Sequence, residues 1–300
     1  MTDGVLIVKS TLVTPAMMLA TNVPETDYSE WAIGTTYAKD ARVILAAEHK
    51  IYQSMQAGNV GKQPLTEALW WIEVGPTNRW KPYDLSNSTQ MVSSGDIFYE
   101  IATGIASNAV ALLNMSGALG VRVRVIDPTF GTLYDKSTSL VTIPTESSWY
   151  AWFFGERVQQ TQFIALDLPS YPNAKIRIDV TGAPVIGVIL VGQLKTVGYG
   201  VKYGVRVGIK DFSQKKRNTW GDTILVEGPY AKRASFPIVV KNTELDNTYA
   251  VLASVRATPC LFIGYKPYAC TIIFGFPSEF EIAIPYANES DCTLDIEGLT

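Results

Sequence analysis

Alternation of apolar and polar residues with a period of two is the feature that most restricts what this chain can fold into. Residues 120–126 alternate valine with arginine. The same alternation recurs in residues 175–181, 203–209 and 279–284. Successive side chains of an extended strand point to opposite faces, so each segment has one apolar and one polar face. One-sided strands are typical of antiparallel sandwiches, and the sequence therefore predicts a mainly β protein.

One segment has helical spacing instead. Its apolar residues recur at intervals of three and four positions, at Leu245, Tyr249, Leu252 and Val255. Thr243 and Asp246 stand three residues apart, as the two ends of a capping box do, and Pro259 follows the segment. The pattern predicts one helix in the last third of the chain.

Composition divides the chain into four parts. Residues 1–25 predict an extended N-terminal arm with a strand donated to a neighbouring molecule, and residues 26–85, rich in Trp and Tyr, predict a small β module. Residues 86–196 predict a central antiparallel β-sandwich. Residues 197–300 predict a C-terminal β-rich domain that contains the helix. No segment has the composition of a flexible linker, so we expect the parts to pack rigidly.

The inventory of reactive side chains narrows the chemistry. His49 is the only histidine, so any Ser/His/Asp or Cys/His mechanism would have to use it. Cys260, Cys270 and Cys292 lie in apolar stretches without CxxC spacing and are interpreted as small core residues. We therefore expect no catalytic residues, no metal and no cofactor.

Carboxylates leave one enzymatic alternative open. A glycosidase needs two of them across a cleft. The central region supplies six candidates, which are Glu100, Asp127, Asp135, Glu146, Glu156 and Asp167. Their spacing singles out no pair, and we expect a protein that is not an enzyme.

The charge balance limits the partners. With 25 Lys and Arg against 28 Asp and Glu, the formal net charge is −3, which gives no basic field for nucleic acid. Hydrophobic runs end well before the roughly 18 residues that a spanning helix needs, so no membrane insertion is expected. The N-terminus lacks the basic start of a secretion signal.

Aromatic residues crowd into the segment 28–83. They are Tyr28, Trp31, Tyr37, Tyr52, Trp70, Trp71, Trp80 and Tyr83. Large rings can fill the core of a small module, and they can also form a flat platform on which sugar rings stack. The candidate carbohydrate-binding residues are Trp31, Tyr37, Tyr52, Trp71 and Trp80.

The order of residues in this segment resembles a known family. Trp31, residues 37–43, residues 52–54, residues 61–64 and Trp70-Trp71 together resemble the small chitin-binding-like carbohydrate modules of chitinases, which also recur in phage tail proteins. The resemblance covers about a fifth of the chain. It implies binding of a host surface glycan, or else a packed β unit within a virion.

A second resemblance extends along the chain. The segments that carry it are residues 75–84, 121–128, 133–135, 233–236, 252–260 and 292–299. They look similar to a family of tailed-phage structural proteins usually encoded among tail or baseplate genes. The resemblance implies a component of the phage particle rather than a catalyst. We expect a tail or baseplate subunit, made in the host cytoplasm and located in the virion tail, which forms a symmetric homo-oligomer and attaches other tail proteins. The alternative is a receptor protein of the tail that binds host glycan.

Two segments are candidates for partner contacts. Residues 149–154 read Trp-Tyr-Ala-Trp-Phe-Phe and predict a strand with aromatic residues on both faces. The candidate assembly contact consists of Trp149, Tyr150, Trp152, Phe153 and Phe154, with burial between two layers of the same chain as the alternative. The basic run of residues 215–217 predicts a solvated loop, with a partner contact as the alternative.

Overall fold

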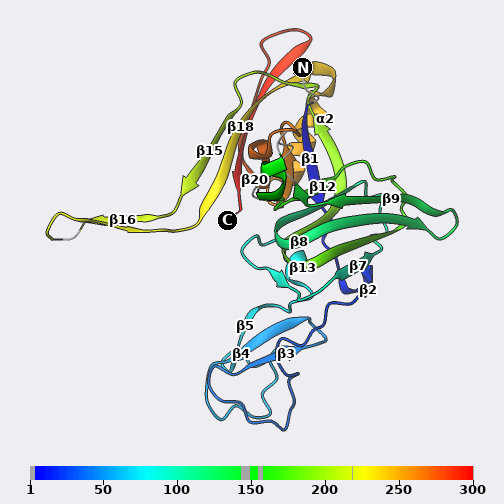
Figure 1. The fold of residues 1–300 in the computed structure, drawn as a ribbon. Coiled ribbons are helices and arrows are strands. Elements are labelled where there is room, and N and C mark those ends of the chain that lie inside the picture. Colours follow the sequence, from blue (N-terminus) through cyan, green and yellow to red (C-terminus); the bar gives the residue numbers. More distant parts are fainter. Residues whose placement is uncertain (1–3, 143–148, 155–157, 218, 300) are drawn as a thin grey trace.

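The computed structural model describes residues 4–142, 149–154, 158–217 and 219–299, and antiparallel strands dominate it (Figure 1). The strands are β1 (Val5–Ser10), β2 (Met18–Thr21), β3 (Arg42–Leu45), β4 (Lys50–Ser54), β5 (Trp71–Pro76), β6 (Met91–Val92), β7 (Ile97–Ile101), β8 (Ala109–Asp127), β9 (Gly131–Ser139), β10 (Val141–Thr142), β11 (Val158–Gln159), β12 (Phe163–Ala165), β13 (Lys175–Val197), β14 (Gly200–Val201), β15 (Arg206–Asp211), β16 (Gln214–Arg217), β17 (Thr223–Val226), β18 (Tyr230–Lys241), β19 (Cys260–Ile263), β20 (Ile272–Ala283) and β21 (Glu289–Gly298). The α-helices are α1 (Trp149–Phe154) and α2 (Leu245–Val255), and 3-10 turns cover Pro15–Met17, Lys81–Tyr83, Asn242–Glu244 and Ala269–Thr271. The predicted mainly β class is confirmed.

One large sheet joins most of the molecule. Its main path runs β12-β8-β13-β1-β19-β20-β21-β18-β14, and β2, β6, β7, β9 and β15 branch from it. The small sheet β3-β4-β5 forms a separate module at the bottom of Figure 1. The central and C-terminal parts of the chain therefore share a continuous hydrogen-bonded sheet.

The long strands β8 and β13 build the central part by bending. Gly117 and Gly182 have φ of +68° and +106°, and the register between the two strands shifts at Thr181. A side chain on Gly117 would meet the carbonyl oxygen of Ala183 at 2.2 Å, so the corner requires glycine there. Strands that bend at such irregularities can contribute to two packed layers. Leu112 and Val123, on either side of the bend in β8, lie in the same hydrophobic cluster.

The prediction that the N-terminal strand is donated to a neighbouring molecule is wrong. β1 pairs antiparallel with both β13 and β19 of its own chain, so it fills a place inside its own sheet. Ile7 packs in the cluster beneath α2, whereas Val8 packs in the cluster between the central and C-terminal parts. A strand with apolar side chains on both faces fits a position that is covered on both sides.

The predicted helix is confirmed as α2, and its apolar side covers the C-terminal sheet. Leu252 and Val255 are fully buried, while Tyr249 is half exposed with its ring edge against Phe280. The capping box is wrong: Thr243 lies in the preceding 3-10 turn, and no side chain caps the helix.

The aromatic segment 149–154 is a helix, α1, and not the strand that we predicted. Its sequence has no alternation that would favour a strand over a helix, because nearly every position is aromatic. Trp149 and Phe153, four residues apart, stack with their ring centroids 6.4 Å apart, as neighbours on one helix face do.

Strands β15 and β18 extend beyond the body and continue into the ribbon β16–β17, which forms the long projection in Figure 1. We call residues 206–233 the arm. The predicted strand in residues 203–209 is present from Arg206 onward, but its apolar side is not covered. Val207 and Ile209 remain 46% and 63% exposed.

Candidate functional site

The aromatic residues of the small module form its core. Tyr37, Tyr52 and Trp71 are buried together with Val43, and Trp31 packs against them half-buried. The ring of Tyr37 meets that of Trp71 edge-on at 5.2 Å. Trp71 Nε1 donates to the carbonyl oxygen of Lys62 at 2.8 Å. Buried rings in edge contact leave no flat open face, so the structure corrects the expectation of a sugar platform at Tyr37, Tyr52 and Trp71.

Trp80 belongs to a different core. It packs with Tyr83 in the cluster of the central part, and its ring lies 4.7 Å from that of His49. His49 Nδ1 and Thr77 Oγ1 both contact the carboxylate of Glu25, at 2.8 and 2.7 Å. The single histidine therefore holds a structural position where the module meets the central part.

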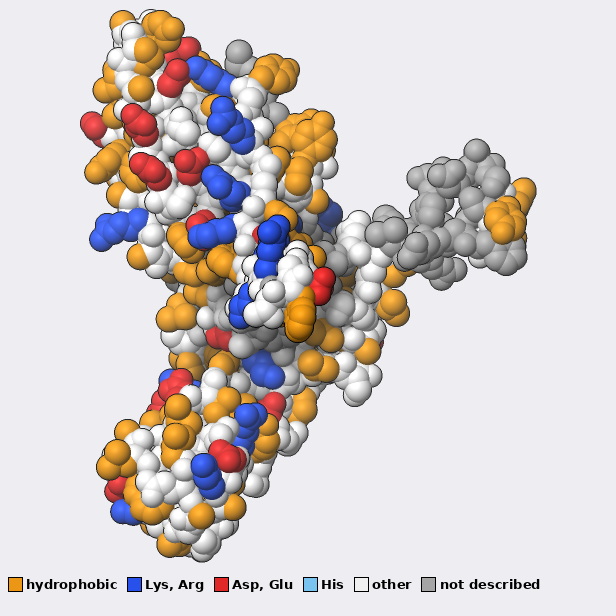
Figure 2. All heavy atoms as spheres, turned by 90° about the vertical axis from the view of Figure 1, so that its left-hand side faces the viewer, with side chains coloured by type: hydrophobic (Ala, Val, Ile, Leu, Met, Phe, Trp, Pro, Cys, Tyr) orange, Lys and Arg blue, Asp and Glu red, His pale blue; other side chains and the backbone are white. Residues whose placement is uncertain are grey.

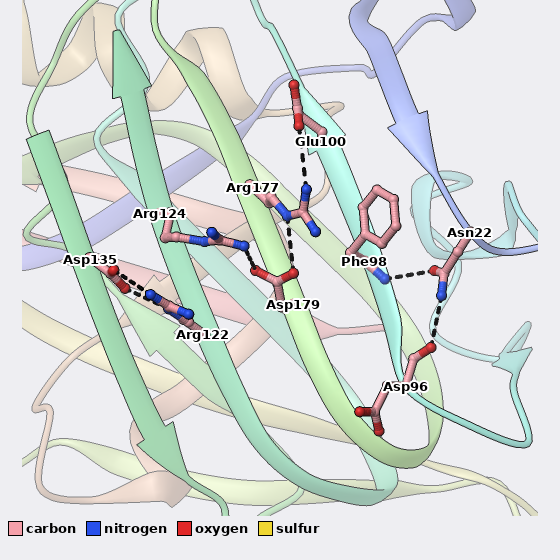
Figure 3. A network of polar contacts seen from close by, with 9 residues as sticks. All are labelled: Asn22, Asp96, Phe98, Glu100, Arg122, Arg124, Asp135, Arg177 and Asp179. Atoms are coloured by element: carbon pink, nitrogen blue, oxygen red, sulfur yellow. Dashed lines mark hydrogen bonds and ion pairs between the residues drawn. The ribbon is translucent and has the colours of Figure 1, made fainter. Parts of the chain in front are cut away.

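A ladder of alternating charge crosses the outer face of the central sheet (Figure 3). Arg122 of β8 donates two hydrogen bonds to Asp135 of β9, from Nε at 2.7 Å and from Nη2 at 2.6 Å. Arg124 of the same strand donates from Nη2 to Asp179 of β13 at 2.7 Å. The hydrogen bonds from Arg122 lower the pKa of Asp135, so this carboxylate stays ionised well below neutral pH.

The ladder continues across β13 to β7. Arg177 Nε donates to Asp179 at 3.0 Å, and its Nη1 lies 3.8 Å from Glu100. The guanidinium of Arg177 also lies 4.2 Å from the ring centroid of Phe98. Lys175 donates to Glu100 at 3.4 Å. These contacts hold the side chains in place as a rigid, mixed-charge surface.

A shallow hollow of about 330 Å³ adjoins this ladder. Its lining includes Phe98, Arg122, Arg124 and Asp179, and Asn22 closes one side by hydrogen bonds to the backbone of Asp96 and Phe98 (Figure 3). Both arginines are already engaged by carboxylates of the ladder. The hollow is therefore a polar contact surface in which charges are matched internally.

Of the remaining candidate carboxylates, the structure describes Asp127 and Asp167, and each has its own separate hydrogen-bond partners. Asp127 accepts hydrogen bonds from the backbone of Thr129 and Phe130 in its own turn. Burial raises the pKa of Asp167, but hydrogen bonds from Tyr134 and Lys136 outweigh it and the net pKa is lowered. Glu146 and Glu156 lie outside the described residues. A carboxyl group with a lowered pKa is a poor general acid at neutral pH.

Two of the three cysteines are core residues. Burial raises the pKa of Cys260 and of Cys292 to about 11, whereas Cys270 is exposed, which corrects the prediction for that residue. Within the described ranges, no three His, Cys, Asp or Glu side chains are grouped as metal ligands.

Three of the five residues predicted for the assembly contact have described side chains in α1, and all three are exposed. Trp149, Tyr150 and Phe153 are 80%, 74% and 66% exposed. The side chains of Trp152 and Phe154 lie outside the described part of the chain.

The sequence did not predict that residues 206–233 form a projecting arm. Its outer ribbon exposes Leu225 and Val226 beside the basic run Lys215–Arg217, which is part of β16 and not a loop. Figure 2 looks at the molecule from the side toward which the arm projects. The alternation in residues 203–209, followed by Gly221 and Gly228, is a sequence pattern that is consistent with a hairpin. No local pattern, however, indicates that its apolar side chains stay exposed.

No family model, curated protein or solved structure matches the chain. Among the described helices, none is long and apolar enough to cross a membrane.

Proposed function

We propose that this chain is a structural subunit of a phage virion, in the tail or baseplate, which assembles into a symmetric oligomer and attaches other tail proteins. The observation that carries the proposal is the arm. A two-stranded ribbon with apolar side chains open to solvent gains little stability by itself, and a neighbouring molecule that covers it would supply the missing burial.

The surface chemistry supports a role in binding. Arginines and carboxylates of the central sheet are bound to each other, which favours a fixed surface for docking over a site for proton transfer. Exposed aromatic side chains of α1 add a second apolar surface. We therefore propose a protein that acts by contact and is not an enzyme.

Of the five residues that the sequence suggested for glycan recognition, four are closed to a sugar ring and only Trp31 is partly exposed. Tyr37, Tyr52, Trp71 and Trp80 are at most 9% exposed, so a sugar ring has no access to their faces. The small module serves, in this proposal, as a packed β unit of the particle.

The proposal is tested by two measurements. Light scattering coupled to size-exclusion chromatography should give a discrete oligomer of the purified chain, or one that forms as the concentration is raised. Mass spectrometry of purified particles of the encoding phage should find the chain among the virion proteins. A chain that is absent from those particles would overturn the proposal.

A further inference from the structure

The outer part of the arm carries cations and apolar side chains on the same face. Lys215 pairs with Leu225 across the ribbon, and Arg217 pairs with Thr223. Residues opposite each other in an antiparallel pair point to one face, so Lys215, Arg217 and Leu225 lie together. Leu225 is 68% exposed. Lys215 forms an ion pair with Asp211 at 3.9 Å between exposed side chains, which is a weak interaction.

The charge of the chain is divided unevenly between the arm and the part that follows it. Residues 206–233 contain seven Lys or Arg and three Asp or Glu, a net charge of +4. Residues 234–300 contain three Lys or Arg and eight Asp or Glu, a net charge of −5. The arm is thus basic in an acidic chain, and opposite charges attract when two copies approach.

The acidic charge gathers on the outward face of β20 and β21. Glu279 and Glu281 point the same way along β20, and Asp295 of β21 lies directly opposite Glu279. Like charges in opposite positions destabilise a sheet unless a cation lies beside them. No ion pair involves these three carboxylates among the described residues, although Lys210 neutralises the nearby Glu297.

A shallow hollow marks the same face. It measures about 700 Å³, and its lining has mixed charge. The carboxylates Glu279, Asp295 and Glu297 come from β20 and β21, and the cations Arg206, Lys210 and Arg233 come from β15 and β18 at the base of the arm. Its floor includes the small residues Gly208 and Ser235, which leave room for a side chain from outside. In Figure 2, acidic and basic side chains lie in neighbouring groups over this upper part of the molecule.

We infer that the arm of one copy docks on this acidic face of a second copy, with Lys215 and Arg217 against Glu279 and Glu281. The inference rests on the proposed assembly of identical copies and names its contact. The ribbon runs roughly 20 Å from Asp211 to Arg217 at about 3.3 Å per residue, enough to reach a neighbour. Lys215 and Arg217 lie at the outer end of the arm, whereas Glu279 and Glu281 lie on β20. The contact therefore joins two different surfaces head-to-tail, and it closes into a ring when the rotation between copies allows it.

The test exchanges the charges of the two surfaces. K215E/R217E makes the arm acidic, and E279K/E281K makes the receiving face basic. Each double variant alone should raise the dissociation constant of the oligomer about tenfold or more, because like charges then meet. An equimolar mixture of the two variants should recover association, because each contact between unlike copies again joins opposite charges. Sedimentation velocity over a range of concentrations measures all three samples.

The matched control for the arm variant is K39E/K266E, which makes the same change in net charge as K215E/R217E at two exposed lysines outside both surfaces. It should associate as the unchanged chain does. Thermal unfolding of each variant establishes that the fold is intact; a variant that does not fold is replaced by its neutral form, K215Q/R217Q or E279Q/E281Q, for which a smaller rise is expected.

Each outcome is decisive. Weakened association of both variants together with recovery in the mixture supports the inference. An oligomer that is indifferent to both charge changes overturns this contact while leaving the proposed function in place. A monomer at every concentration that is nevertheless found in virions means that the arm binds a different protein, and it also overturns the inference. A monomer that is absent from virions overturns both.

Discussion

At the scale of single residues, burial decides what an aromatic side chain can do. The rings of Trp71 and Tyr37 meet edge-on inside the small module, and the indole N–H of Trp71 donates a hydrogen bond to the backbone carbonyl of Lys62. The sequence placed these residues in one module, but the same cluster of rings could be a core or a platform. The choice depends on which side of the sheet receives cover, and that is a property of the assembled module.

The role of Trp71 can be tested by truncation. Because its side chain is 3% exposed, Trp71→Ala should destabilise the module by about 3–5 kcal/mol, as removal of a large buried ring does. Denaturant unfolding of the full chain, followed by fluorescence, measures the change. Ile72→Ala, at a neighbouring half-exposed position, is the control and should change stability by less than about 1 kcal/mol. A Trp71→Ala chain as stable as the control would place Trp71 outside the core.

The cysteines give a prediction with a pH dependence. Cys270 alone should react rapidly with a thiol reagent at pH 8, since burial keeps the thiols of Cys260 and Cys292 protonated with a pKa of about 11. Cys270→Ser should remove the fast phase, and Cys292→Ser should leave it unchanged. Fast reaction of two or three thiols in the folded chain would contradict the burial.

The same two buried thiols link stability to alkaline pH. An unfolded cysteine has an ordinary pKa of about 8.5, so the raised pKa in the folded chain means that folding disfavours the thiolate. Their contribution to stability is complete below about pH 8.5 and is lost as the pH rises toward about 11. Denaturant midpoints measured from pH 8 to 10.5 should fall less in a Cys260→Ala/Cys292→Ala chain than in the unchanged chain. An equal fall of the denaturant midpoint in the two chains would contradict the raised pKa of the two thiols.

At the scale of elements, periodicity predicted those strands whose two faces differ. Residues 120–126 and 175–181 lie in β8 and β13 with their predicted apolar faces buried, because one side meets the core and the other meets solvent or the charged ladder. The spacing of Leu252 and Val255 likewise predicted α2. In these elements local pattern and tertiary environment agree.

Prediction failed where one pattern fits two environments. Five aromatic residues in a run of six allow a strand or a helix, and α1 is a helix. The apolar residues of β1 predicted a strand, and its donation to a neighbouring molecule was wrong, because a sequence does not say whether the strands that pair with it belong to the same chain. The charged ladder was missed for a related reason, since Arg122, Asp135 and Asp179 meet only through the register of three strands.

The position of β1 leads to a prediction about cooperativity. Ile7 is fully buried beneath α2 in a strand that joins β13 to β19. Ile7→Ala should cost about 2–5 kcal/mol, and it should lower the stability of the central and C-terminal parts together, because both pair with this strand. Circular dichroism in the near ultraviolet follows the transition. Leu12→Ala, at an exposed position beyond the strand, is the control. A loss of stability confined to either the central or the C-terminal part would contradict a shared sheet.

At the scale of the whole molecule, the arm and the body differ in how much they depend on each other. The body contains the large hydrophobic clusters, whereas none of the residues described in the ribbon β16–β17 belongs to them. Strands from both sides of the arm in the sequence also pair within the body, since β1 pairs with β19 and β14 pairs with β18. The fold of the body therefore does not require a continuous arm.

Limited proteolysis tests this independence and the exposure of the arm at once. Trypsin should cut the dilute chain first after Lys215, Lys216 or Arg217, because these residues are exposed on a ribbon far from the core. The two fragments should then elute together from a sizing column under native conditions and separate only in denaturant, since the strands that precede the cut remain paired with those that follow it. A chain carrying K215Q/K216Q/R217Q should resist this first cut and unfold at the same temperature. Early cleavage elsewhere, or fragments that part without denaturant, would contradict a body that is held together independently of its arm.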